Sequence, residues 1–171
     1  MSSGGARHLA PWIWLGIPLL QVVVATILFA IPIRVGGLAL PEPVFALPVA
    51  FAWAVIRPSM LAPIGVMLMG LFLDLLWGSP TGLWAVALLL AYGAVLAGRT
   101  ILAGQSRLVM WGWYAAATVL ALLTGYLFTM FDAQVTPDPL SVAWQFLATV
   151  VLYPIADRLI DRFEDADVRF R

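Results

Sequence analysis

Hydrophobic residues in this chain occur in long runs that are interrupted only by short polar segments. Most runs approach the roughly 20 residues that a helix needs to cross a bilayer. They lack the strict alternation of a half-buried strand. The pattern predicts an all-α polytopic membrane protein with six transmembrane helices, expected at about 12–33, 40–56, 59–77, 81–98, 108–131 and 140–155.

The segment at 40–56 is the least regular, because it contains three prolines. Proline lacks a backbone N–H, so we expect irregular first turns there. A five-helix alternative joins this segment to 59–77 as one span. It would place Arg57 in the centre of the bilayer, which is costly, so we keep six.

Beyond residue 155 the pattern becomes that of an amphipathic helix. Ile155, Leu159, Ile160 and Phe163 share one face, and aspartate and arginine side chains lie opposite. We expect residues 156–171 to form a cytoplasmic tail that lies on the membrane surface or on a partner protein.

Composition agrees with a lipid environment. The chain of 171 residues is 63% hydrophobic and 11% charged, whereas soluble domains carry about 25% charged residues. Every predicted loop is short, so residues 1–171 form one membrane domain. With six spans and a cytoplasmic N-terminus, all but Arg34 of the nine arginines fall on the cytoplasmic side. This positive-inside bias predicts a multi-pass membrane protein with both termini in the cytoplasm.

Catalytic chemistry has few candidate residues. The chain has no cysteine and no lysine, and its one histidine, His8, lies in the polar N-terminal segment. Ser79 lies in a glycine-rich turn, but Trp77 occupies a position where the nucleophile-elbow pattern requires glycine. No second carboxylate shares a predicted span with Asp74, so no acid–base pair or metal cluster is visible. We therefore expect no catalytic, cofactor or metal site.

The most specific stretch is 70–83, Gly-Leu-Phe-Leu-Asp-Leu-Leu-Trp-Gly-Ser-Pro-Thr-Gly-Leu. Asp74 lies one turn before the end of an apolar helix, and the turn Gly78-Ser79-Pro80-Thr81-Gly82 follows. A carboxylate at this depth requires a partner, a proton or water. The partner could be Arg34 or the backbone donors of the turn. Alternatively, Asp74 reaches water unpaired, or it forms a site for a partner's helix or a solute.

The start of the helix that follows the 78–82 turn offers two candidate capping residues. The helix after the turn could be capped by Ser79, with Pro80 at its first position, or by Thr81.

Small residues recur four apart, a spacing that lets helices approach closely in lipid. We expect this stripe to receive a partner's span, unless it reflects only the abundance of alanine and glycine in membrane helices. Its members are Ala87/Ala91, Gly93/Ala97, Ala94/Gly98 and Ala117/Ala121/Gly125.

The 70–82 stretch, followed by the apolar segment 85–92 that ends in Tyr92, resembles the signature of the bacterial rod shape-determining protein MreD family. The number of spans, the short loops and the Tyr153-Pro154 break agree with that family. The resemblance implies a fold similar to the substrate-binding membrane subunits of energy-coupling-factor transporters. It also implies a non-catalytic, cofactor-free scaffold of the cell-wall elongation machinery in the bacterial inner (cytoplasmic) membrane. The implied partners are MreC, MreB, RodA and a class B penicillin-binding transpeptidase.

The fold likeness supplies a rival function, that of a substrate-binding subunit of a vitamin transporter. Such a protein needs polar groups that converge in an outward-facing pocket. The predicted spans contain few polar side chains, and few of them lie near the outer face, so we favour the scaffold. Those side chains are Gln21, Asp74, Thr118, Thr124, Gln145 and Thr149.

Overall fold

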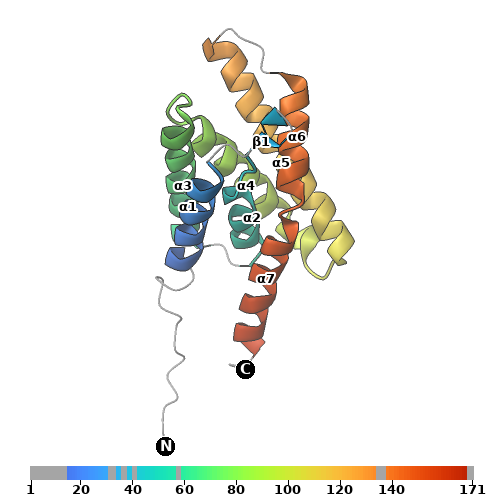
Figure 1. Cartoon of the computed structure of the whole chain (residues 1–171). Coiled ribbons are helices and arrows are strands. Elements are labelled where there is room, and N and C mark those ends of the chain that lie inside the picture. The colour runs from blue at the N-terminus through green and yellow to red at the C-terminus, as the bar shows by residue number, and fades with distance from the viewer. Residues whose placement is uncertain are drawn as a thin grey trace, which may run out of the picture.

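A computed structural model of the chain describes residues 15–30, 34–35, 38–39, 42–56, 59–133 and 138–168. Figure 1 shows a bundle of helices with one small β-ribbon. The elements are α1 (Ile17–Phe29), β1 (Arg34–Val35), β2 (Leu38–Ala39), α2 (Ala46–Ile56), α3 (Leu61–Trp77), α4 (Leu83–Leu102), α5 (Arg107–Ala133), α6 (Pro139–Val150) and α7 (Tyr153–Val168). The predicted helical class is confirmed. In the ribbon, Arg34 pairs with Ala39 and Val35 pairs with Leu38.

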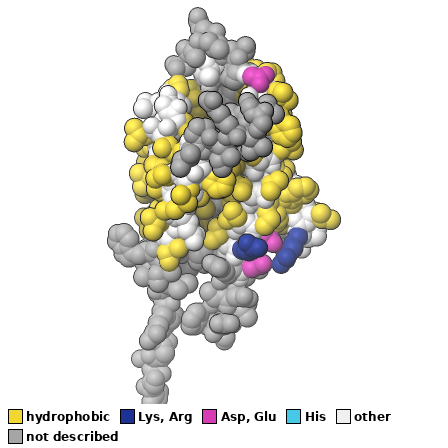
Figure 2. All heavy atoms as spheres, in the orientation of Figure 1, with side chains coloured by type: hydrophobic (Ala, Val, Ile, Leu, Met, Phe, Trp, Pro, Cys, Tyr) yellow, Lys and Arg dark blue, Asp and Glu magenta, His cyan; other side chains and the backbone are white. Residues whose placement is uncertain are grey.

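Three helical segments are long and apolar enough to cross a membrane: Leu83–Leu102, Arg107–Phe131 and Pro139–Asp161, which joins α6 to most of α7. The other apolar helices, α1, α2 and α3, have 10–17 residues. Figure 2 shows hydrophobic side chains over the middle of the molecule, with a group of acidic and basic side chains below them and an acidic side chain near the top. Exposed side chains such as Leu75 and Phe131, both 84% exposed, suit contact with lipid.

Helix α2 occupies the interior of the bundle. Every residue from Ala46 to Ala54 is buried, as is typical of a helix that is apolar on all sides. With 11 residues it is roughly 16 Å long, so the span predicted at 40–56 is too long. Pro48 lies in the first turn of α2, where its missing N–H costs little. The irregular start expected from the prolines is therefore confirmed.

The helical path bends where α6 ends at Val150 and α7 begins at Tyr153. Pro154 lies in the first turn of α7, where it cannot continue the hydrogen bonds of α6. The buried face of α7 consists of Tyr153, Ala156 and Ile160, and this helix packs on α2. On the predicted apolar face, Ile155 is 39% exposed, whereas Ile160 is covered by the chain itself rather than left free for the membrane or a partner. The side chain of Phe163 lies outside the described residues.

Helices α1 to α6 alternate in direction and α7 continues in the direction of α6, so the connections gather at two ends (Figure 1). The α3–α4 turn and the start of α6 lie at one end, which we call the Asp74 end. The α4–α5 turn, the beginning of α1 and the end of α7 lie at the other end, which we call the Arg107 end. The beginning of α1 and the end of α7 therefore lie at the same end of the bundle.

Candidate functional site

Asp74 is buried at the Asp74 end, with 1% of its surface exposed. Its carboxylate accepts three hydrogen bonds. Ser79 Oγ donates to Oδ1 (3.1 Å), the Gly82 backbone N–H donates to Oδ2 (2.8 Å), and the Trp84 backbone N–H donates to Oδ1 (2.9 Å). Gly82 and Trp84 lie at the start of α4, where backbone N–H groups lack helical partners. A side chain of α3 thus caps the next helix and places its negative charge at the positive end of that helix's dipole.

This confirms the prediction that Asp74 accepts a hydrogen bond from a backbone donor of the 78–82 turn. The predicted caps of α4 are wrong, because Gly82 is the N-cap residue, with φ +97° and no side-chain hydrogen bond of its own. Gly78 ends α3 with φ +63°. Both glycines therefore occupy the left-handed region, which other residues adopt at a cost. Pro80 lies between them, and its carbonyl accepts from the Leu83 N–H. The side chain of Arg34, the other predicted partner, lies outside the described residues.

The contact between α3 and α4 is closest at Gly70, one turn before Asp74. A β-carbon on Gly70 would lie 2.3 Å from the Ala85 Cα and 2.4 Å from the Ala85 nitrogen. These distances leave no room for any side chain. Sequence reasoning placed Gly70 in the motif but did not assign it this role. Its four-residue spacing from Asp74 was the available signal, because it puts both on one face of α3.

A second polar layer surrounds this cap. The Trp77 indole N–H donates to the Glu42 carboxylate, and the Trp77 ring meets the Trp84 ring edge to face, with centroids 4.9 Å apart. Gln145 Nε2 of α6 donates to the Glu42 carbonyl (3.1 Å). The Thr149 hydroxyl accepts from the Val44 N–H (3.1 Å). These bonds hold the segment before α2 between α3 and α6.

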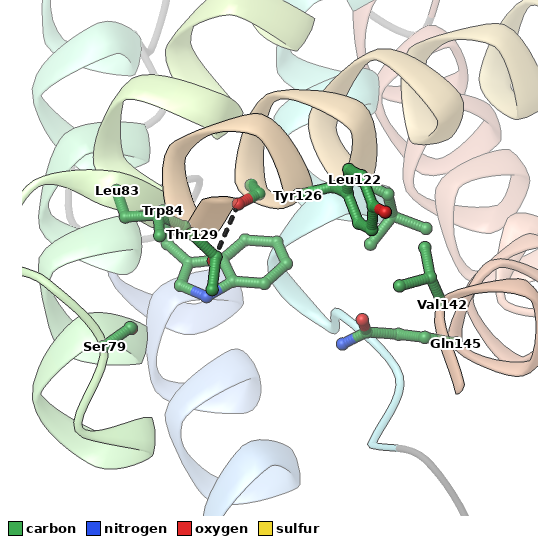
Figure 3. Close-up of a pocket in the computed structure, with 9 residues that line it drawn as sticks. Ser79, Leu83, Trp84, Leu122, Tyr126, Thr129, Val142 and Gln145 are labelled. Atoms are coloured by element: carbon green, nitrogen blue, oxygen red, sulfur yellow. Dashed lines mark hydrogen bonds between the residues drawn. The ribbon is translucent and has the colours of Figure 1, made fainter. Parts of the chain in front are cut away.

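A cavity of about 140 Å³ lies beside this layer. Figure 3 shows the Gln145 side chain extending from α6 toward the Trp84 indole of α4, with residues of α5 above them. Both the burial of Trp84 and the convergence of polar groups follow from contacts between helices distant in sequence. The lining residues are Ser79, Leu83, Trp84, Leu122, Gly125, Tyr126, Thr129, Val142 and Gln145.

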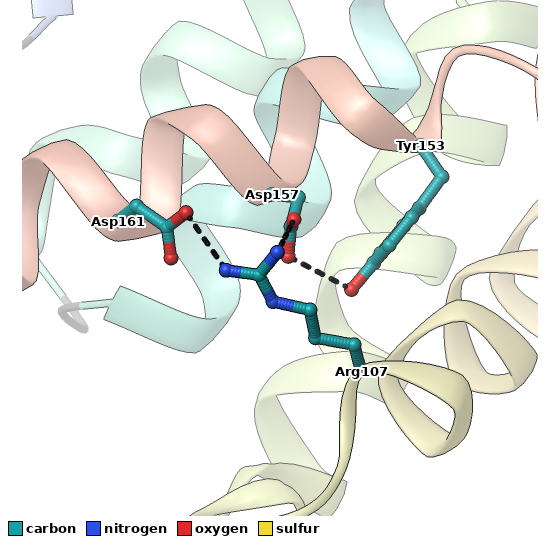
Figure 4. Close-up of polar contacts among 4 residues, drawn as sticks. All are labelled: Arg107, Tyr153, Asp157 and Asp161. Carbon is teal, nitrogen blue, oxygen red and sulfur yellow. Dashed lines mark hydrogen bonds and ion pairs between the residues drawn. The ribbon is translucent and has the colours of Figure 1, made fainter.

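The Arg107 end carries a charged cluster that joins α5 to α7 (Figure 4). Arg107 forms ion pairs with Asp157 (3.5 Å) and Asp161 (3.3 Å), and the Tyr153 hydroxyl donates to Asp157 (3.3 Å). The Arg107 side chain is 75% exposed, so these pairs stabilise weakly. The cluster positions α7 and holds no reactive group.

The small-residue stripe of α5 faces inward. Ala117 and Ala121 are 5% and 0% exposed. Gly125 is buried, and a β-carbon added to it would lie 3.5 Å from the Leu83 side chain of α4. The expectation that these three residues receive a partner's span is therefore wrong, because their own chain covers them. In α4, by contrast, Gly93 and Ala97 are exposed.

The described residues contain no group of three or more histidine, cysteine, aspartate or glutamate side chains that could hold a metal ion. The site therefore offers hydrogen bonding and shape, with Asp74 already satisfied by three donors. No protein-family model, curated protein or solved structure matches this chain.

Proposed function

We propose that this protein is a non-catalytic scaffold of the bacterial cell-wall elongation machinery and lies in the inner membrane as a six-span protein. One observation carries the proposal. The stretch that resembles the MreD signature forms one helix–turn–helix arrangement. In it, Gly70 allows α3 and α4 to come into contact, and Asp74 caps α4 across the turn. The glycine and the aspartate of that signature thus each have a structural role in this chain.

The topology part of the proposal rests on charge and length. Arg107 and Arg158 belong to helices that meet at the Arg107 end, and Arg99 lies in the last turn of α4 nearby. Asp138 lies at the other end. This distribution supports a cytoplasmic Arg107 end by the positive-inside rule. The three shorter apolar helices complete six passes, with α2 shielded from lipid by its neighbours.

The proposed partners are MreC first, and through it MreB, RodA and a class B penicillin-binding transpeptidase. A scaffold requires a rigid shape more than a reactive group, and the cap and the buried α2 core provide rigidity. The rival transporter function is less well supported. A drug-sized ligand occupies a pocket of about 300–1,000 Å³, whereas this cavity has about 140 Å³.

Depletion of the protein in its host tests the proposal, with cell shape and vitamin dependence read from the same cultures. We expect cells to widen and round, and vitamin supplements not to rescue them. Normal shape, with growth restored by one supplement, would contradict the scaffold function and favour the transporter. Co-purification of MreC with the tagged full chain from native membranes provides a second test of the same proposal.

A further inference from the structure

The cavity beside Trp84 has a chemistry that the scaffold function does not use. We propose that it binds a neutral, hydroxyl-bearing group about as large as glycerol or one small ring. Such a group occurs in free polyols and in the glycerol end of a neutral lipid. This inference is independent of the proposed function.

Size sets the first limit. A cavity of about 150 Å³ holds one benzene molecule, and this cavity has about 140 Å³. The site therefore accommodates one small ring or a three-carbon polyol.

Hydrogen-bonding capacity sets the second limit. Trp84 is 8% exposed, and within the described residues its indole N–H has no hydrogen-bond partner. Figure 3 shows that nitrogen on the side of the ring facing the space between Ser79 and Gln145. Gln145 donates through Nε2 to Glu42, which leaves its carbonyl oxygen as an acceptor. The indole N–H is therefore able to donate to a hydroxyl oxygen bound in the cavity, and the Gln145 carbonyl oxygen is able to accept from that hydroxyl.

Charge sets the third limit. None of the nine lining residues is an aspartate, glutamate, histidine, lysine or arginine. Ser79 Oγ already donates to Asp74 and Thr129 Oγ1 already donates to the Gly125 carbonyl, so both hydroxyls remain available as acceptors. Donors and acceptors without a charged group match a neutral hydroxyl, which both donates and accepts.

Depth supports a group that belongs at the membrane–water boundary. Thr129 lies two residues before Phe131, where the second candidate span ends, and Val142 lies three residues after Pro139, where the third begins. The cavity thus lies within roughly two helical turns of the span ends, near the level of lipid glycerol groups. Both a lipid hydroxyl and a solute from water can reach this level.

The test uses the full chain in phosphatidylcholine nanodiscs, with every tryptophan replaced by 5-fluorotryptophan. The ¹⁹F resonance missing from Trp84→Phe identifies Trp84. The probes are glycerol, monoolein and methyl oleate, of which the last carries the oleoyl chain without free hydroxyls. We expect a saturable shift of the Trp84 resonance with monoolein if lipid is the source, or with glycerol if the source is soluble. Methyl oleate is expected to cause no such shift.

Variants of the cavity make the result specific. Val142→Phe fills the cavity and is expected to abolish the shift. Val119→Phe should leave the shift unchanged, because Val119 of α5 does not line the cavity and is 50% exposed. If Val142→Phe does not fold, Tyr126→Phe serves instead. We expect it to weaken binding about fivefold through one lost hydrogen bond. The absence of a saturable shift with both hydroxylated probes, or an equal shift with methyl oleate, would overturn the proposal.

Discussion

A β-carbon placed on Gly70 of α3 would lie 2.3 Å from the Cα atom of Ala85 in α4, so the two backbones touch there. The contact explains why the helix that carries Asp74 lies close enough to the start of α4 to cap it. Steric contact and capping are therefore two parts of one arrangement, which the following predictions separate.

The first prediction concerns Gly70→Ala. One added methyl group meets backbone atoms that cannot rotate away, so the helices must separate. We expect a loss of about 3 kcal/mol or more, at the upper end of overpacking effects. Thermal unfolding of the detergent-solubilised protein measures it. Gly93→Ala is the matched control, because nothing lies within 4 Å of its β-position. Equal stability of the two variants would refute the close contact.

The second prediction concerns Asp74→Ala. Removal of the carboxylate leaves the Gly82 N–H, the Trp84 N–H and the Ser79 hydroxyl without their acceptor. We expect a loss of about 3–5 kcal/mol, because each unsatisfied buried donor costs about 1–3 kcal/mol and the losses overlap. Asp138→Ala removes an exposed cap and should cost less than Asp74→Ala. A smaller effect at Asp74 than at Asp138 would contradict the buried cap.

The third prediction concerns the pairing of Asp74 with Arg34 that the sequence left open. The Asp74 carboxylate already accepts hydrogen bonds from three donors, so the contribution of Arg34 to folding should not depend on Asp74. We expect the losses of folded yield from Asp74→Asn and Arg34→Gln to add. In free energy, additivity holds within about 0.5 kcal/mol for independent sites. A double variant no worse than the poorer single variant would instead indicate a direct pair.

The fourth prediction concerns pH. The Ser141 hydroxyl and the Leu140 N–H donate to Asp138, and these hydrogen bonds hold the pKa of its carboxyl below the ordinary value. A lowered pKa means that the carboxylate stabilises the start of α6 above the ordinary pKa and that this stabilisation is lost as pH falls through the lowered value. Ser141→Ala should raise the pKa of Asp138, as measured by carboxyl ¹³C NMR titration. An unchanged titration would exclude the hydroxyl as a cause.

The fifth prediction compares the two attachments of α7. Ile160→Ala removes buried apolar contact with the core and should cost about 2–4 kcal/mol. Arg107→Gln removes exposed ion pairs to Asp157 and Asp161 and should cost about 0.2–1 kcal/mol, less at high salt. Hydrogen exchange of α7 amides measures both. Faster exchange in the Arg107 variant than in the Ile160 variant would mean that charge, rather than burial, holds α7.

Sequence reasoning was most successful for features that depend on neighbouring residues. It placed α3 and α5 within about two residues of their observed ends, because apolar runs are local patterns. It failed for the α5 stripe of Ala117, Ala121 and Gly125. Small residues serve close contacts within a chain and between chains equally well.

By itself, the sequence determined that this chain is helical, apolar and punctuated by turns, and it singled out Asp74 as the unusual group. Those properties follow from composition and from short-range periodicity. The tertiary structure alone decided that the Asp74 partners are N–H groups of the next helix, that α2 lies in the core, and that Trp84 and Gln145 border one cavity. The physical reason is that these contacts join different helices, and the periodicity of one helix does not specify which other helix its close-contact face, such as that of Gly70, will meet.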